Sequence, residues 1–416
     1  MHILHVVQLY HPVKSGAGRY FEEIGARLVA DGHQVTVLST DAYDLEHFWM
    51  AGRRRVELAE EWHRGMRIVR LPVQRLPGPP LLYPALRRVM AECSRFPGSA
   101  GLLRSLATIT PQLAGLQQFL ATAGPFDLIH AGNITLDFAI LPALAAARAA
   151  AVPFICTPFV HVGVPGEQNL VRYYTMRHQI ELLRAAAAVG CMTTIEAEDL
   201  VQRGVRREQV HVIGAGVDPA EVAGGDGDRF RAEQQIAGPV VLYIGALARD
   251  KGAIDTVEAM RQLWARGQEA TLVLIGAPLA HFQHYYQQLP AADQARIRLL
   301  PYASDALKRD ALAAADLFTL PSRTDSFGIV FLEAWCYGVP VVGARAGGIP
   351  GVINDGADGV LVPYGNPSEL ARALADLLTD PAKRQRFGAA GRAKVDHQLT
   401  WDHVYQRAQT MIAGLE

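Results

Sequence analysis

The sequence predicts two consecutive α/β domains, each built on a doubly wound parallel sheet. With 416 residues the chain is too long for one ordinary hydrophobic core. Short runs of Val, Ile and Leu alternate with longer amphipathic segments, a pattern typical of βαβ units. A segment rich in Gly, Asp and Ala, residues 214–238, separates two such series and indicates an interdomain linker or a solvent loop.

The predicted elements follow from this alternation. We expect a first domain over residues 1–217, a second over 218–395, and a C-terminal segment, 396–416, whose helix at 401–415 returns toward the first domain. Helical patterns lie between many of the strands, for example at 19–31 and 195–203. The expected strands are 3–7, 35–38, 68–71, 128–130, 154–157, 189–192 and 210–213, then 240–244, 272–275, 297–300, 317–320, 341–342 and 360–362.

Composition narrows the class of protein. Half of the residues are hydrophobic and 19% are charged, as in globular proteins, and a net charge of -1 argues against a nucleic-acid binder. The four cysteines form no CxxC pair, so we expect free thiols and a cytoplasmic location. Residues 2–7 have a strand pattern, not that of a signal peptide, and the apolar stretch 138–155 predicts a helix followed by a core strand, not a membrane span.

The second half holds the most specific stretch, residues 320–334. A strand ends at Leu320, a polar loop follows, and Ser326 is a competent N-cap for a helix opening there. The amides of residues 327–330 would then have no intrahelical acceptor and would favour an anion such as a diphosphate. By contrast, the pair Asp226 and Asp228 predicts a hydrophilic turn and not a metal site, because no strand leads into it.

Two acids flank this helix start. Asp325 precedes it and Glu333 lies about two turns along, so their carboxylates could accept hydrogen bonds from a sugar and from a ribose on either side of a diphosphate. The alternative makes Asp325 a second capping residue and Glu333 a solvated helix charge. The apolar residues after Glu333 favour a functional role, because a carboxylate there needs a partner.

In the first half, a glycine-containing loop follows the first strand. Gly16 and Gly18 would let the backbone approach a ligand at the start of a helix. A plain strand-to-helix turn explains the same residues. The segment lacks the third glycine of the dinucleotide fingerprint, which makes a nicotinamide-dependent dehydrogenase a distant alternative.

These motifs together resemble a known family. The runs PSRTDSFGIVFLEAWCYGVPVV, GARAGGIPGVINDG and GVLVP, with YIGALARDKG upstream, are similar to the donor site of retaining GT-B glycosyltransferases of family 4. The resemblance implies two Rossmann-like domains facing a cleft, with the acceptor bound by the first and a nucleotide-diphosphate sugar by the second. It also implies that the C-terminal helix packs back on the first domain.

The resemblance also assigns roles in the donor site. Asp325, where the family usually has Glu, would hold donor-sugar hydroxyls, and Glu333 would hold the nucleotide ribose. Backbone amides of Phe327, Gly328 and Ile329 would face the diphosphate and the sugar.

Further roles concern the phosphate and the sugar. Lys251 falls on the family's phosphate-binding lysine, whereas the usual arginine is replaced by Ala246, for which Arg249 is a candidate substitute. His161, two residues further from its strand than in the shorter family form, is the candidate histidine beside the donor sugar. Tyr302 would flank the base or serve as a rim aromatic, and Gly16 and Gly18 would contact the diphosphate and acceptor.

The implied activity is retaining transfer of a hexose-type sugar to a hydroxyl acceptor, in cell-envelope glycan, glycolipid or small-molecule glycoside synthesis. No metal and no cofactor are expected, because Lys251 and its neighbours would neutralise the leaving diphosphate. The alternatives are a nucleotide-sugar epimerase, a phosphorylase, or a non-catalytic module that binds nucleotide sugars. The last is made conceivable by Ala246 and by Gly351, where the family often has Glu.

The resemblance does not explain one region of the sequence. Residues 51–104 contain many arginines and few acids. A solvated basic surface explains them, and the alternative is peripheral contact with an anionic membrane or a lipid-phosphate acceptor.

Overall fold

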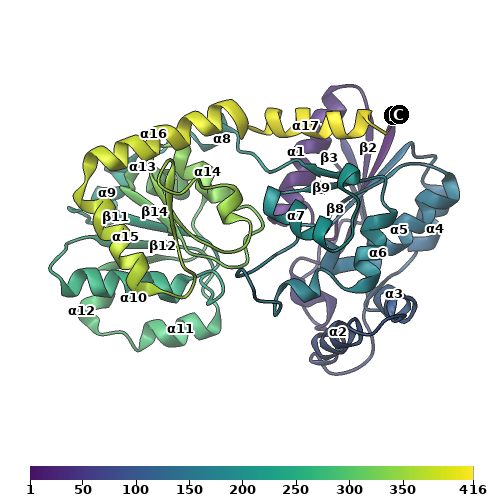
Figure 1. Cartoon of the computed structure of the whole chain (residues 1–416), viewed down its shortest axis with the longest axis horizontal. Coiled ribbons are helices and arrows are strands. Elements are labelled where there is room, and N and C mark those ends of the chain that lie inside the picture. The colour runs from purple at the N-terminus through teal and green to yellow at the C-terminus, as the bar shows by residue number, and fades with distance from the viewer. Residues whose placement is uncertain (416) are drawn as a thin grey trace. The chain divides into compact units, whose positions relative to one another are not determined.

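The computed structural model describes residues 1–415 and divides by its internal contacts into two compact units (Figure 1). The first unit comprises Met1–Val160, Gln168–Gly214 and the chain from Tyr405 on. The second comprises His161–Glu167 and Ala215–Val404. The chain therefore changes unit at Gly214, three residues before the predicted boundary at 217, and a short excursion at 161–167 belongs to the second unit.

The first unit is built on an eight-stranded sheet of order β10-β9-β8-β7-β1-β2-β4-β3. Every neighbouring pair is parallel except β3 and β4, and β5 pairs with β6 separately. The predicted strands are present within a few residues, whereas β3, a polar edge strand, carries no hydrophobic pattern and was not predicted. The strands are β1 His2–Val6, β2 Gln34–Thr40, β3 Glu60–His63, β4 Met66–Leu71, β5 Val73–Gln74, β6 Gln112–Leu113, β7 Leu128–Gly132, β8 Phe154–Thr157, β9 Ala188–Cys191 and β10 Val210–Val212.

Helices connect these strands. The predicted helix and core strand within 138–155 are confirmed as α5 and β8. The α-helices are α1 Gly16–Ala30, α2 Leu82–Cys93, α3 Ala100–Thr108, α4 Leu116–Thr122, α5 Asp137–Ala150, α6 Arg177–Ala185 and α7 Thr194–Gln202, with 3-10 turns at Leu45–Phe48, Ile134–Leu136, Val171–Tyr173 and Arg207–Gln209.

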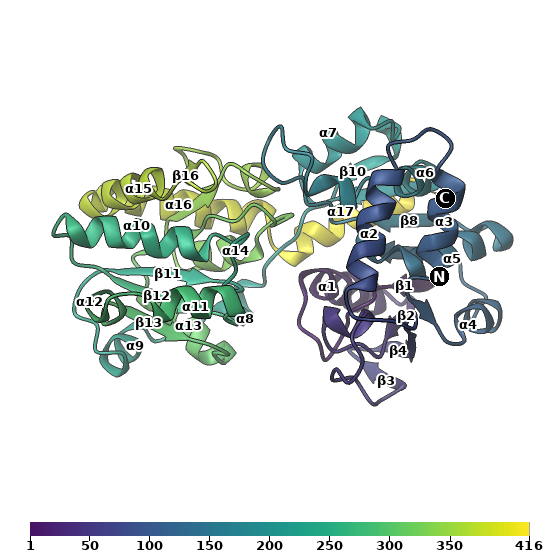
Figure 2. The ribbon, with the colours of Figure 1, turned by 90° about the horizontal axis from the view of Figure 1, so that it is seen from below.

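The second unit has a six-stranded, wholly parallel sheet of order β13-β12-β11-β14-β15-β16. In Figure 2, α10 and α15 cover one face of this sheet, and α9 and α13 cover the other. The strands are β11 Val240–Ile244, β12 Thr271–Ile275, β13 Ile297–Leu300, β14 Leu317–Leu320, β15 Val341–Ala344 and β16 Gly359–Val362. The helices are α8 Pro219–Val222, α9 Gly227–Glu233, α10 Ala253–Ala265, α11 Ala280–Gln287, α12 Ala291–Gln294, α13 Asp305–Ala314, α14 Ile329–Cys336, α15 Pro367–Thr379 and α16 Pro381–Gln398, with a 3-10 turn at Ile349–Gly351.

From Tyr405 on, the last helix, α17 (Trp401–Ala413), belongs to the first unit. The hydroxyl of Tyr405 and the side-chain amide of Gln409 both donate to Asp31 Oδ2 at 2.7 Å. Arg407 Nε donates to the carbonyl of Ile213 at 2.7 Å. The end of the chain is thus held by side-chain hydrogen bonds to the first unit.

The segment 214–238, predicted as a linker or a solvent loop, carries the change of unit after Gly214 but is not a continuous loop. It contains α8 and α9, and Phe230 of α9 is fully buried in the second unit. Asp226 caps α9 by accepting from the amide of Arg229, and its own amide donates to Asp310. The polar composition therefore reflects capping and docking of short helices.

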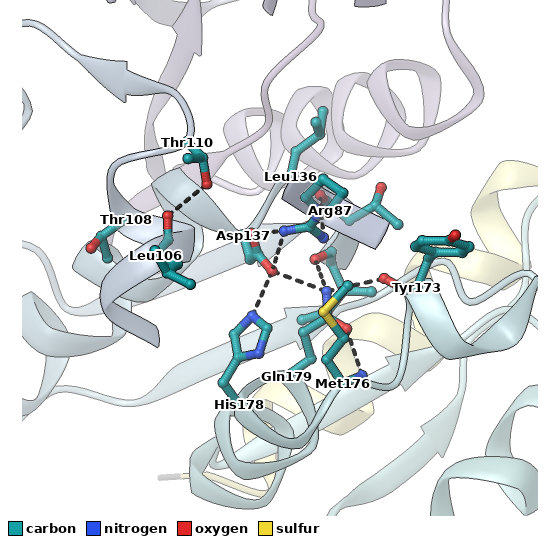
Figure 3. A network of polar contacts seen from close by, with 12 residues as sticks. Arg87, Leu106, Thr108, Thr110, Leu136, Asp137, Tyr173, Met176, His178 and Gln179 are labelled. Atoms are coloured by element: carbon teal, nitrogen blue, oxygen red, sulfur yellow. Dashed lines mark hydrogen bonds and ion pairs between the residues drawn. The ribbon is translucent and has the colours of Figure 1, made fainter. Parts of the chain in front are cut away.

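A buried polar network fixes three helices of the first unit (Figure 3). Asp137, at the start of α5, accepts two hydrogen bonds from Arg87 Nη1 of α2, at 2.9 and 3.2 Å. Its Oδ2 also accepts from the side chains of His178 and Gln179 of α6, at 2.9 and 3.0 Å. Burial raises the pKa of Asp137, but the Arg87 charge and the hydrogen bonds outweigh it, so the pKa is lowered.

Most arginines of residues 51–104 are engaged within the chain. Arg53 pairs with Asp44, Arg67 with Glu60 and Arg104 with Glu181. Ion pairs thus neutralise part of the arginine charge in this segment. Among residues 1–415, no helix combines the length and hydrophobicity that a membrane crossing requires.

Candidate functional site

The second sheet has its switch point between β11 and β14. From β11 the strand order runs through β12 to β13 on one side, and from β14 through β15 to β16 on the other. Ligands of doubly wound proteins bind where the order reverses, at the carboxyl ends of the strands. The loops that follow β11 and β14, residues 245–252 and 321–328, occupy that position and carry Lys251 and Asp325.

The two loops are locked together by backbone and side-chain contacts. The amide of Arg323 donates to the carbonyl of Asp250 at 3.0 Å, and the Thr324 hydroxyl donates to its carboxylate at 3.0 Å. Gly252 adopts a positive φ of 74°, and a Cβ there would lie 2.3 Å from the carbonyl oxygen of Pro321. Only glycine allows this approach, so the site is built on a rigid pair of loops.

Lys251 and Asp325 meet in this site. Lys251 Nζ lies 3.1 Å from Asp325 Oδ2, with side chains 25% and 21% exposed. Burial raises the pKa of Asp325, but the Lys251 charge and a hydrogen bond from Ser322 outweigh it, so the net pKa is lowered. The carboxylate therefore stays ionised and available to accept hydrogen bonds.

His161 belongs to the same unit and the same electrostatic cluster. Its segment, 161–167, is held to the loop after β15 by a hydrogen bond from the Gly347 amide to the Gly163 carbonyl, at 2.7 Å. Burial, aided by the Lys251 charge, lowers the pKa of His161 to about 4, against opposing effects of Asp325 and Asp250. The imidazole is therefore neutral near pH 7.

The prediction that Ser326 caps a helix opening beside it is wrong. Helix α14 begins at Ile329, and its N-cap is Gly328 with a φ of 88° and no side-chain cap. This left-handed turn delays the helix because the preceding loop is tied to Asp250 and to the loop after β15 through the Gly348 amide and the Asp325 carbonyl. Within the described residues, the first-turn amides of Ile329 and Val330 have no recorded acceptor.

Glu333 has a partner that the sequence did not indicate. On α14, its Oε1 lies 2.8 Å from Lys308 Nζ of α13, and its Oε2 is buried without a hydrogen-bond partner within the described residues. The lysine stands near the start of its helix, where a cation is disfavoured by the helix dipole. The sequence carried no signal for this pair, because the two residues lie on different helices.

Of the remaining candidates, Arg249 and Phe327 lie in the same two loops, whereas Tyr302 follows β13. Arg249 is exposed, its amide donates to His281 Nε2 at 2.8 Å, and its carbonyl accepts from Tyr364 at 3.1 Å. Tyr302 is 83% exposed, after β13. Phe327 is buried beside Gly328. The roles of these residues stay predictions.

Gly16 and Gly18 belong to the first unit. They open α1, whose N-cap is Ser15, and the amide of Gly18 donates to the Ser15 hydroxyl at 2.9 Å. Their predicted contacts with a diphosphate and an acceptor stay predictions.

Family models match both halves of the chain. Residues 15–216 match the "Glycosyl transferase 4-like domain", and residues 227–394 match "Glycosyl transferases group 1". The chain belongs to the GT-B glycosyltransferases of the family 4 type. The predicted family is thereby confirmed.

Curated members of this family match part of the chain. A D-inositol 3-phosphate glycosyltransferase of Xylanimonas cellulosilytica is 31% identical over 235 residues, which are 53% of this chain and 55% of that protein. A GDP-mannose-dependent monoacylated alpha-(1-6)-phosphatidylinositol monomannoside mannosyltransferase of Corynebacterium glutamicum is 30% identical over 181 residues, 42% of this chain and 47% of that protein. The matched region thus spans about half the length of these curated relatives.

Solved structures superpose on all or nearly all of the chain. Anabaena Alr3699/HepE, solved in complex with UDP and glucose, superposes with a TM-score of 0.72 at 21% identity and covers 100% of both chains. WaaG, a glycosyltransferase involved in lipopolysaccharide biosynthesis, gives 0.65 at 17% identity over 99% of both chains. These similarities establish the fold, two Rossmann-like α/β domains with parallel sheets.

Proposed function

We propose that this GT-B protein transfers a hexose-type sugar from a nucleotide-diphosphate donor to a hydroxyl acceptor, with retention of anomeric configuration and without a bound metal ion. The observation that carries the proposal is the Lys251–Asp325 pair at the switch point, with His161 in the same cluster. A cation, an ionised acid and a neutral imidazole provide the groups that a diphosphate and a sugar require.

The charges suit the departure of a nucleotide diphosphate. When the donor bond breaks, negative charge develops on the leaving phosphate. Lys251 and the first-turn amides of α14 would stabilise that charge, and removal of one such preorganised contact typically costs about 2.7–4 kcal/mol. These groups would replace a divalent cation.

The hydroxyl contacts are assigned to the two acids. Asp325 would accept from the donor sugar and Glu333 from the ribose, and His161 would hydrogen-bond the sugar as a neutral group. The departing phosphate would deprotonate the acceptor hydroxyl on the same face of the sugar, which gives retention without a protein base.

The printed names of relatives suggest which donors to test. One curated relative is described as GDP-mannose-dependent, and HepE was solved with UDP-glucose as well as with UDP and glucose. We therefore propose a UDP- or GDP-linked hexose as the donor and a hydroxyl compound such as a glycan, a glycolipid or a small molecule as the acceptor.

Donor screening and product analysis test the proposal. The full chain is screened by thermal shift with UDP-, GDP- and ADP-sugars, since a ligand at 100 times its Kd adds about 2.7 kcal/mol of stability. The donor that binds is then incubated with candidate acceptors, with and without EDTA, and the anomeric configuration is read by NMR. We expect a retained product in both conditions. An inverted product, loss of activity with EDTA, or epimerisation or phosphorolysis without transfer would contradict the proposal.

We also propose that the protein is cytoplasmic and that residues 51–104 make peripheral contact with an anionic membrane. The four cysteines are free thiols, which favours a reducing compartment. Leu81, Val89 and Phe96 are exposed apolar side chains near α2. Flotation with liposomes that contain anionic lipid should recover the chain, and the same recovery without anionic lipid or none at all would contradict an electrostatic contact.

A further inference from the structure

Lys308 and Glu333 lie at similar distances from the starts of two helices of the second unit. Helix α13 begins at Asp305 after β13, and α14 begins at Ile329 after β14. Both strands are parallel, so both helices start at the same edge of the sheet. Lys308 and Glu333 each lie about one turn inside that edge, where the nucleotide of a doubly wound protein binds.

Only one of the two carboxylate oxygens of Glu333 accepts a hydrogen bond within the described residues. Its Oε1 accepts from Lys308 Nζ at 2.8 Å, whereas its Oε2 is buried without a partner within the described residues. The two side chains are 26% and 13% exposed, for lysine and glutamate respectively. A buried oxygen of an ionised acid is costly to leave unpaired, so this atom is a ready acceptor for a ligand hydroxyl.

Lys308 forms an ion pair with this acid across two helices. Lys308 lies in the first turns of α13, where a cation is opposed by the helix dipole. The favourable partner is Glu333, from a helix that follows the next strand along the chain. The pair therefore orients the carboxylate, with one oxygen fixed and the other presented.

We propose that Lys308 is a positioning and specificity residue of the nucleotide site, which holds Glu333 so that its free oxygen selects a nucleotide by its ribose hydroxyls. This inference rests on the proposed function, because it takes the ligand to be a nucleoside diphosphate. Lys308 acts through Glu333 and not on the phosphates. Its contribution must therefore depend on the ribose hydroxyls.

The test compares UDP, GDP and ADP with their 2′,3′-dideoxy counterparts by calorimetric titration of the full chain. Lys308→Met should weaken binding of the preferred nucleotide about tenfold or more, as expected for loss of a hydrogen bond to a charged group. The dideoxy form, which cannot donate to Glu333, should lose little. Lys308→Arg should restore much of the binding, and Lys308→Met should cost nothing further in a Glu333→Gln background.

Lys383→Met is the matched control. Lys383 is also 26% exposed and ion-paired with an acid of the same unit, Asp376, so its loss tests a structural surface pair. The control should bind both nucleotide forms like the wild type. Equal weakening of the ribose and dideoxy forms by Lys308→Met, or no weakening, would overturn this inference alone. A wild-type chain that binds none of the three nucleotides would overturn the proposed function as well.

Discussion

Each unit contains ion pairs between basic and acidic side chains, but those of the first unit are buried and those of the second are partly exposed. In the first unit, Asp137 is enclosed by Arg87, His178 and Gln179 and receives hydrogen bonds on both oxygens. In the second, Lys251–Asp325 and Lys308–Glu333 are partly exposed pairs at the carboxyl edge of a parallel sheet. One set is closed by the protein, whereas in the other Glu333 Oε2 has no hydrogen-bond partner within the described residues.

The difference separates a structural role from a binding role. The Arg87 and Asp137 side chains are 8% and 1% exposed, and Arg87 also donates to the Thr135 carbonyl. A buried ion pair of this kind resists the loss of either partner, because the remaining charge is left without compensation. The pairs of the second unit are partly solvated, so their removal should affect ligands more than folding.

Arg87→Met should give the largest effect on stability. It leaves the Asp137 carboxylate buried without its cation, and we expect a loss of about 3–5 kcal/mol in the free energy of unfolding. Chemical denaturation measures it. Arg104→Met is the control, since its exposed pair with Glu181 should contribute at most about 1 kcal/mol. Similar losses in both variants would remove the contrast between the two units.

Lys251→Met should affect activity more than folding. We expect turnover to fall at least about a hundredfold, from loss of a cation at the leaving phosphate, and unfolding free energy to change by less than about 1 kcal/mol. Initial rates with the donor identified by screening, together with denaturation curves, measure both quantities. A stability loss as large as that of Arg87→Met would place this pair among the structural ones.

Protonation of His161 should make the smallest of these contributions, a change in the stability of the fold with pH. Because the folded pKa is about 4, below the ordinary value of 6.5, the unfolded chain binds a proton more readily. Stability should therefore fall as pH drops from about 6.5 toward 4, and His161→Asn should reduce that fall by on the order of 1 kcal/mol. Unfolding curves at several pH values measure it, with His397→Asn, an exposed histidine, as the control. Identical slopes for wild type and His161→Asn would show that the folded state does not disfavour protonation of His161.

The sequence by itself determined the fold and indicated the acids of the candidate site. Strands β11, β13 and β14 coincide with the predicted ranges, because buried parallel strands read as short apolar runs whatever their neighbours. Lys251 and Asp325 were assigned through the family resemblance, and the structure shows that their loops follow the neighbouring strands β11 and β14.

Only the tertiary structure decided the partners and the helix start. Lys308 with Glu333, and Arg87 with Asp137, come from segments far apart in the sequence, and a helical period does not specify which helix faces which. The start of α14 at Ile329 depends on Gly328 in a left-handed turn, which the contacts of the preceding loop impose. Local patterns set the elements, whereas side-chain partners depend on how those elements pack.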